Sequence, residues 1–122
     1  MIAGSVSPDR EPVVCISVRD ACGRDHRHNA IVDTGFTGWL TLPPDTISLL
    51  GLQWKEVGTA VLADANLVSF DVYDGAVAWD GQVLEIPVDE AEAEPLVGMA
   101  LMSGYEILAQ DVYGGAVTLR RM

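Results

Sequence analysis

Three features of the sequence predict an all-β fold of barrel or sandwich type. Short apolar runs rich in β-branched residues are separated by turn residues, and only two segments have a helical pattern. The longest run, 67–79, alternates apolar and polar residues from Phe70 onward, as a half-buried strand does. Asp80-Gly81 follows it at once and is a strong signal for a two-residue hairpin turn.

About ten short strands and two short helices are expected from this pattern. The first helix opens at Pro43-Pro44-Asp45 and ends at Leu50, with Gly51 as its stop, and the second covers 99–104. Asp64-Ala65-Asn66 has the residues of a hairpin tip, where Asn66 tolerates a positive φ. The stretch 89–94 is expected to be an acidic loop. The expected strands are 13–18, 28–32, 39–42, 57–63, 67–79, 83–88, 96–98, 107–111 and 116–120.

Length and charge limit the classes of function. A chain of 122 residues, 49% of them hydrophobic, is expected to form one domain spanning 1–122 with its own core. The net charge of −11, from 18 acidic and 7 basic residues, argues against nucleic acid and against an anionic membrane as partners. We interpret the charge as a means of solubility.

Cysteine usage and hydropathy bear on the compartment. Cys15 and Cys22 do not form a disulfide framework or a CxxC motif, and we expect two reduced thiols. The first residues lack the basic and apolar regions of a signal peptide, and no apolar run reaches the ~18–20 residues that span a bilayer. These features predict a protein of the cytoplasm, in a bacterium.

Asp33-Thr34-Gly35 is the motif that carries chemistry. It follows the apolar run Ala30-Ile31-Val32, which places a carboxylate on a loop at the end of a strand. Thr34 is expected to supply a buried hydroxyl that ties down the loop backbone. Gly35 is expected to allow a tight turn and to offer its N–H to the carboxylate, because it has no side chain in the way.

Two such carboxylates together can hydrolyse a peptide without a metal or a covalent nucleophile. One takes a proton from water while the other gives a proton to the carbonyl oxygen. Placed ~3 Å apart they cannot both ionise, so one pKa rises, the other falls, and the pair titrates as a unit. The chain contains no second Asp-Thr-Gly or Asp-Ser-Gly, so the second carboxylate must come from Asp33 of another copy.

Together with Leu96-Val97-Gly98 near the C-terminal end, the motif resembles the retropepsin-like aspartic proteases, and among them the small bacterial clan AA group. The resemblance covers most of the chain. It implies a closed acid-protease barrel with one or two short helices, in a homodimer. The matching segments are Val32 to Gly38, Leu40-Thr41-Leu42-Pro43, Leu62 to Asn66, Trp79-Asp80-Gly81, Leu96 to Met99 and the final hairpin.

The resemblance also implies roles for other residues. Leu96, Val97 and Gly98 would brace the Asp33 loop, and a flap formed by Ala63, Asp64, Ala65 and Asn66 would cover the substrate. The flap tip of this group commonly carries glycine, so Ala65 and Asn66 predict a stiffer flap. Many relatives place an acidic residue or an Arg-Asp pair after the second motif, whereas Met99-Ala100 stand here, which predicts a weaker dimer.

The function expected from these features is that of an aspartic endopeptidase, with Asp33 catalytic, a peptide or protein as substrate, and no cofactor. The alternative is a protease-like dimeric β domain that acts as a binding or interaction module with weak or no turnover.

Other candidate residues have two interpretations each. His26 and His28 would share one side of a strand, which can seed a zinc site, but without a third ligand we expect two solvated histidines and no metal. Phe36 either shapes a substrate pocket or packs in the core. Asp64 either contacts substrate or is a plain turn residue. The acidic run 89–94 is interpreted as a solvated loop, with a trap for basic substrates as the alternative.

Overall fold

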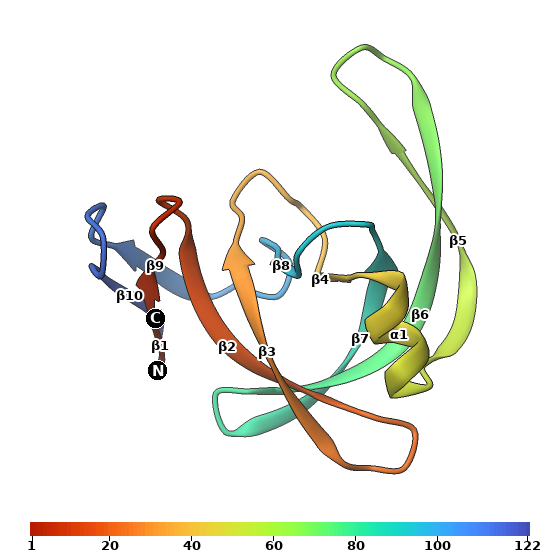
Figure 1. Cartoon of the computed structure of the whole chain (residues 1–122), viewed down its shortest axis with the longest axis horizontal. Coiled ribbons are helices and arrows are strands. Elements are labelled where there is room, and N and C mark those ends of the chain that lie inside the picture. The colour runs from red at the N-terminus through yellow and green to blue at the C-terminus, as the bar shows by residue number, and fades with distance from the viewer.

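The computed structural model describes residues 1–122 and contains ten strands and one helix (Figure 1). The all-β prediction is therefore confirmed. The strands are β1 (Ile2–Val6), β2 (Pro12–Arg19), β3 (Asp25–Val32), β4 (Leu40–Leu42), β5 (Gln53–Val61), β6 (Leu67–Trp79), β7 (Gln82–Glu90), β8 (Leu96–Val97), β9 (Tyr105–Ala109) and β10 (Ala116–Arg121), and the helix is α1 (Pro44–Leu50).

The strands form one sheet that closes on itself. Its order is β5-β6-β7-β4-β8-β3-β2-β1-β10-β9, and β6 also pairs with β2 through Ala78 and Val77 opposite Ser17 and Val18. This extra pairing makes β2, β3, β8, β4, β7 and β6 a closed barrel, while β5 extends one side and β1, β10 and β9 the other. Closure pairs the parts of β2 and β6 that β1 and β5 leave unpaired, while β5 and β9 remain the edge strands of the sheet.

The barrel encloses a core of 19 buried apolar residues. Alternation along each strand explains which residues face it, since successive side chains point to opposite faces. On β2, for example, Val14, Ile16 and Val18 are buried. The same alternation points the other side chains away from the core, and two of these, Thr41 and Val72, are buried as well.

Helix α1 lies where the sequence predicts it. Pro44 occupies its first turn, and Gly51 ends it with φ of 67°, a left-handed conformation that glycine adopts without strain. Ile47 and Leu50 are its buried residues. The prediction of a second helix at 99–104 is wrong, because the segment forms consecutive turns. Gly104, with φ of 85°, ends the segment before a helix can extend.

β1, a strand that the sequence did not predict, joins the two ends of the chain within the same sheet. β1 pairs with both β10 and β2, and the N-terminal ammonium binds the Asp80 carboxylate. That ion pair, together with a hydrogen bond from the Tyr105 hydroxyl, lowers the pKa of Asp80. Cys15 and Cys22 are both free thiols, as expected. None of the helical structure is long and apolar enough to span a membrane.

Candidate active site

Asp33 begins the loop that leaves the barrel at the end of β3. β3 and β8 are parallel neighbours, with Ile31 opposite Leu96 and Val32 opposite Val97. The Asp33 N–H continues this ladder and donates to the Val97 carbonyl at 3.0 Å. Because Val32 and Val97 are both buried, the base of the loop is fixed in the core.

Three more backbone hydrogen bonds join this loop to the segment after β8. The Gly98 N–H donates to the Trp39 carbonyl at 3.0 Å, the Met99 N–H to the Phe36 carbonyl at 2.8 Å, and the Ala100 N–H to the Gly38 carbonyl at 3.0 Å. The structure thus brings Val97 and Gly98 against the Asp33 loop. Leu96, the residue before Val97 on β8, does not contact the loop in this way and pairs with Ile31 and Thr41.

The close approach of the two segments requires glycine at 98. A Cβ built on Gly98 would lie 2.1 Å from the Gly38 carbonyl oxygen and 2.6 Å from the Phe36 ring. A Cβ on Gly38 would meet the same ring at 2.6 Å. Phe36 therefore packs on both glycines and remains half-buried, so its ring stabilises the loop itself.

The Asp33 carboxylate is oriented by its own loop. The Gly35 N–H donates to Asp33 Oδ1 at 2.9 Å, and a Cβ on Gly35 would lie 3.2 Å from that oxygen, so a side chain there would crowd the carboxylate. Asp33 is half-buried. The expectation of a buried Thr34 hydroxyl is wrong for this single chain, because Thr34 is exposed at the loop's tip.

The predicted flap residues lie away from Asp33. Ala63 to Asn66 form the tip of the β5–β6 hairpin, which projects beyond the barrel in Figure 1, and no hydrogen bond joins them to the Asp33 loop. Asn66 bonds to Asp64 through its backbone N–H at 3.1 Å and its side-chain amide at 2.8 Å. The positive φ of the tip falls on Ala65, at 66°, and not on Asn66.

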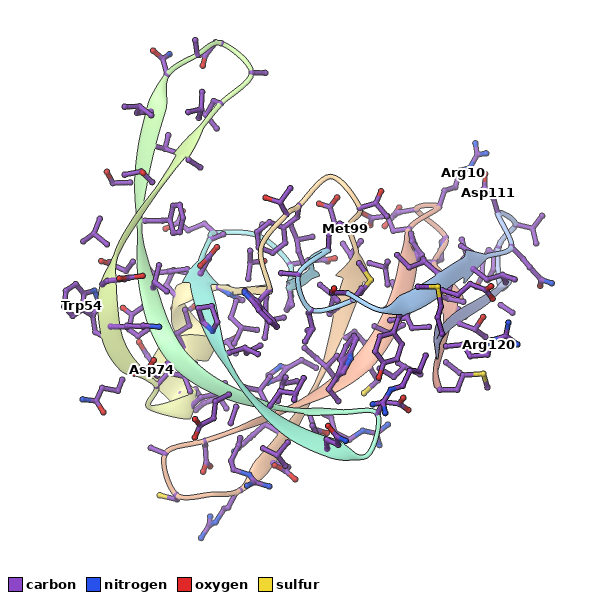
Figure 2. All side chains as sticks on the ribbon, turned by 180° about the vertical axis from the view of Figure 1, so that it is seen from behind. Arg10, Trp54, Asp74, Met99, Asp111 and Arg120 are labelled. Atoms are coloured by element: carbon purple, nitrogen blue, oxygen red, sulfur yellow. The ribbon has the colours of Figure 1, made fainter.

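The far half of this hairpin is unusually apolar for an exposed segment. Figure 2 shows its side chains extending with no other part of the chain against them. Val61, Leu62 and Leu67 are all exposed there. Such surfaces commonly mark binding sites.

The sequence predicts no role for Thr41, although the residue lies in the segment Leu40-Thr41-Leu42-Pro43. It is the one polar residue among those that are buried, and its Oγ1 accepts the Leu96 N–H at 3.0 Å. The bond ties β8 to β4 directly behind the Asp33 loop. The pattern Leu40-Thr41-Leu42 held the signal, because a hydroxyl between two core residues must face the opposite side of a strand.

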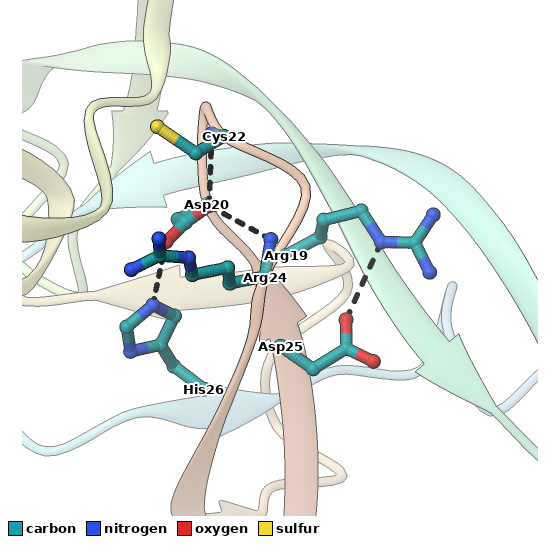
Figure 3. A network of polar contacts seen from close by, with 6 residues as sticks. All are labelled: Arg19, Asp20, Cys22, Arg24, Asp25 and His26. Carbon is teal, nitrogen blue, oxygen red and sulfur yellow. Dashed lines mark hydrogen bonds and ion pairs between the residues drawn. The ribbon is translucent and has the colours of Figure 1, made fainter.

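The two histidines that could seed a metal site both lie on β3. His26 Nε2 contacts Asp20 Oδ2 at 2.7 Å, and Asp20 Oδ1 accepts the N–H groups of Cys22 and Arg24, at 2.8 and 2.9 Å (Figure 3). These bonds lower the pKa of Asp20, that from His26 most. No group of three potential ligands occurs in the chain. His26 and His28 are both half-buried, so the expectation of two solvated histidines is wrong.

Comparison with known proteins identifies the fold. No protein-family model and no curated protein matches the chain. Among solved structures, EIAV protease in complex with the inhibitor HBY-793 is similar with a TM-score of 0.59 and 14% identity, over 78% of this chain and 88% of that one. A retropepsin-like aspartic protease from Rickettsia conorii is similar with a TM-score of 0.55 and 15% identity, over 98% of this chain and 90% of that one. The protein therefore has the retropepsin-like acid-protease fold.

Proposed function

We propose that the protein is a homodimeric aspartic endopeptidase whose active site consists of one Asp33 from each of two identical subunits. The observation that carries the proposal is the Asp33 loop itself. It presents an oriented carboxylate, with Gly35 N–H at 2.9 Å from Oδ1, on a loop held by backbone hydrogen bonds to Val97, Gly98, Met99 and Ala100. A rigid loop keeps a catalytic group in its reactive geometry.

The surface around the loop supports assembly of two chains. Thr34 and Gly35 are exposed at the tip, and the large apolar side chains of Trp39 and Met99 are 37% and 42% exposed beside it. Figure 2 labels Met99 on the segment that adjoins the loop. A two-fold axis past the loop tip would bury these groups and bring the two Asp33 carboxylates together.

In the proposed reaction the two carboxylates share one proton. The ionised Asp33 takes a proton from water as the water oxygen bonds to the peptide carbonyl carbon, and the protonated Asp33 gives its proton to the carbonyl oxygen. Collapse of the tetrahedral intermediate breaks the C–N bond, and the nitrogen leaves with a proton from the pair. The hairpin tips, Ala63 to Asn66 of each subunit, would cover an extended peptide, and the exposed apolar side chains of Val61, Leu62 and Leu67 beside them would exclude water.

The test is peptide cleavage as a function of protein concentration. Wild type is expected to cleave a diverse peptide mixture, and Asp33→Asn at matched concentration is expected to lose at least about a thousandfold in rate. Specific activity should fall on dilution below the dimer dissociation constant, in step with the dimer fraction measured by light scattering.

Two results would contradict the proposal. Equal cleavage by wild type and Asp33→Asn would show that another group or a contaminant does the chemistry. A dimer that binds peptides with equal affinity in both forms and cleaves none of them would favour the alternative function, a binding module built on the protease fold.

A further inference from the structure

A row of side chains crosses the sheet from the Asp33 loop to the hairpin. The row begins at Ile31, two residues before Asp33, and Ile31 pairs with Leu96. Leu96 pairs in turn with Thr41, and Thr41 pairs with Asp89. Asp89 pairs with Val72, which is the last residue of the row. Cross-strand partners share one face of a sheet. The residues next to them, Val32, Val97, Leu40 and Val88, fill the core, so the row lies on the face away from the core.

Asp89 is the one charged residue in that row. The prediction of a solvated acidic loop is wrong for this residue, because Asp89 and Glu90 are the last residues of β7. Asp89 is half-buried, and its Oδ2 lies 3.5 Å from where a Gly38 Cβ would be, so the carboxylate sits over the Asp33 loop.

Nothing in the chain neutralises this carboxylate. The five ion pairs involve other residues, and no side-chain hydrogen bond reaches Asp89. Neighbouring Glu90 differs, since it accepts a hydrogen bond from the Tyr73 hydroxyl at 3.5 Å. Burial raises the pKa of Asp89, which means that the site disfavours an unpaired negative charge there.

We propose that Asp89 is a specificity-determining residue that binds a lysine or arginine side chain of the peptide substrate. This inference rests on the proposed protease function. A half-buried carboxylate without a partner, beside the catalytic loop and on the face that leads to the hairpin, is a site that a cationic side chain completes. The net charge of −11 would draw basic peptides toward the protein.

The position of the basic residue follows from the sheet. β3, β8, β4 and β7 are consecutive strands. With strands ~4.8 Å apart, Asp89 lies roughly 14 Å from Ile31 across the sheet, and an extended peptide advances ~3.3 Å per residue. A long basic side chain would therefore reach Asp89 from roughly two to four residues away from the scissile bond. Because a dimer presents Asp89 twice, the preference should occur on both sides of that bond.

The experiment is cleavage-site profiling of a proteome-derived peptide library by mass spectrometry. Wild type is expected to enrich lysine and arginine about tenfold over the library background at one position or two symmetric positions within about four residues of the cut. Asp89→Asn is expected to lose that enrichment. The matched control is Glu85→Gln, which removes an exposed carboxylate from the same strand and should keep it.

A pair of synthetic substrates covers the case in which Asp89→Asn does not fold. Two peptides that differ only by lysine or norleucine at the enriched position are given to wild type, and kcat/KM is expected to be about tenfold higher for lysine. Equal values for the two peptides, or enrichment that persists in Asp89→Asn, would overturn the role of Asp89 and leave the protease proposal standing. Absence of cleavage of any peptide by the wild-type dimer would overturn both.

Discussion

The backbone N–H of Leu96 donates to the Thr41 hydroxyl at 3.0 Å, so a buried side chain of β4 holds the strand that supports the Asp33 loop. β8 has only two residues, and this bond adds to its short ladders with β3 and β4. Removing the acceptor would leave the Leu96 N–H unsatisfied in a part-buried place.

Thr41→Val is therefore expected to destabilise the protein by about 1–3 kcal/mol, although it preserves the shape of the side chain. Thr41→Ser keeps the acceptor and loses one methyl group, which should cost about 0.8 kcal/mol. Urea unfolding at equilibrium measures both. Thr41→Val as stable as wild type would show that the hydroxyl does not contribute.

A second prediction concerns the contact between the two halves of the site. In Gly98→Ala the new Cβ would lie 2.1 Å from the Gly38 carbonyl oxygen, and backbone cannot move aside as a flexible side chain does. We expect a loss of at least about 4 kcal/mol or no folded protein. Gly23→Ala, at a turn with φ of 84° and open space around it, should cost only about 1–2 kcal/mol. Similar losses in both variants, by thermal unfolding, would contradict the steric argument.

Local signals in the sequence account for much of this fold. β6 has the predicted bounds 67–79, α1 ends at the predicted Leu50, and Asp80-Gly81 forms the predicted hairpin turn with both φ values positive. In each case neighbouring residues determine the structure, through alternation, a proline at the helix start, or turn residues. The close pairing of Gly98 with the Asp33 loop came from resemblance to a family and not from the residues alone.

Features that depend on distant partners could not be predicted. β1 is a strand because β10, at the other end of the chain, pairs with it. The barrel closes through Ser17 opposite Ala78, a contact with no local signal. Asp89 looked like part of an acidic loop because its sequence neighbours are charged, and only pairing with Thr41 and Val72 places it in the sheet.

The third prediction concerns the hairpin tip. Ala65 has φ of 66°, in the left-handed region that costs a non-glycine residue about 1–2 kcal/mol. Ala65→Gly removes that strain but increases the entropy of the unfolded chain, so we expect a net gain of only about 0.5 kcal/mol. Ala63→Gly, nearby without a positive φ, should lose stability instead. Urea unfolding of the two variants compares the signs, and a loss in both would contradict the strain at Ala65.

The fourth prediction is a pH effect from His28. Its strand partner Ile16 is buried, its Nε2 has no hydrogen-bond partner, and burial lowers the pKa of His28 from the ordinary 6.5, with a smaller contribution from His26. As pH falls below that ordinary value, the unfolded chain binds a proton that the folded chain binds less readily, so stability falls.

His28→Leu should therefore lose less stability than wild type between about pH 7 and pH 5. Arg27→Gln, an exposed change on the same strand, should keep the wild-type slope. A wild-type slope in His28→Leu would contradict the prediction.

The fifth prediction tests the cost of an unpaired charge at Asp89 without any substrate. Burial raises the pKa of Asp89, so between its ordinary and its raised value the folded chain binds more protons than the unfolded chain. Stability is therefore lost as pH rises through that interval, and Asp89 destabilises the ionised protein at neutral pH.

Asp89→Asn should be more stable than wild type at about pH 7, by urea unfolding, and the difference should shrink toward about pH 3, where Asp89 is protonated in both states. Glu85→Gln, exposed on the same strand, should change stability little at either pH. If Asp89→Asn were instead less stable at neutral pH, the carboxylate would have a partner within the chain, and the folded protein would leave no unpaired charge for a basic side chain to neutralise.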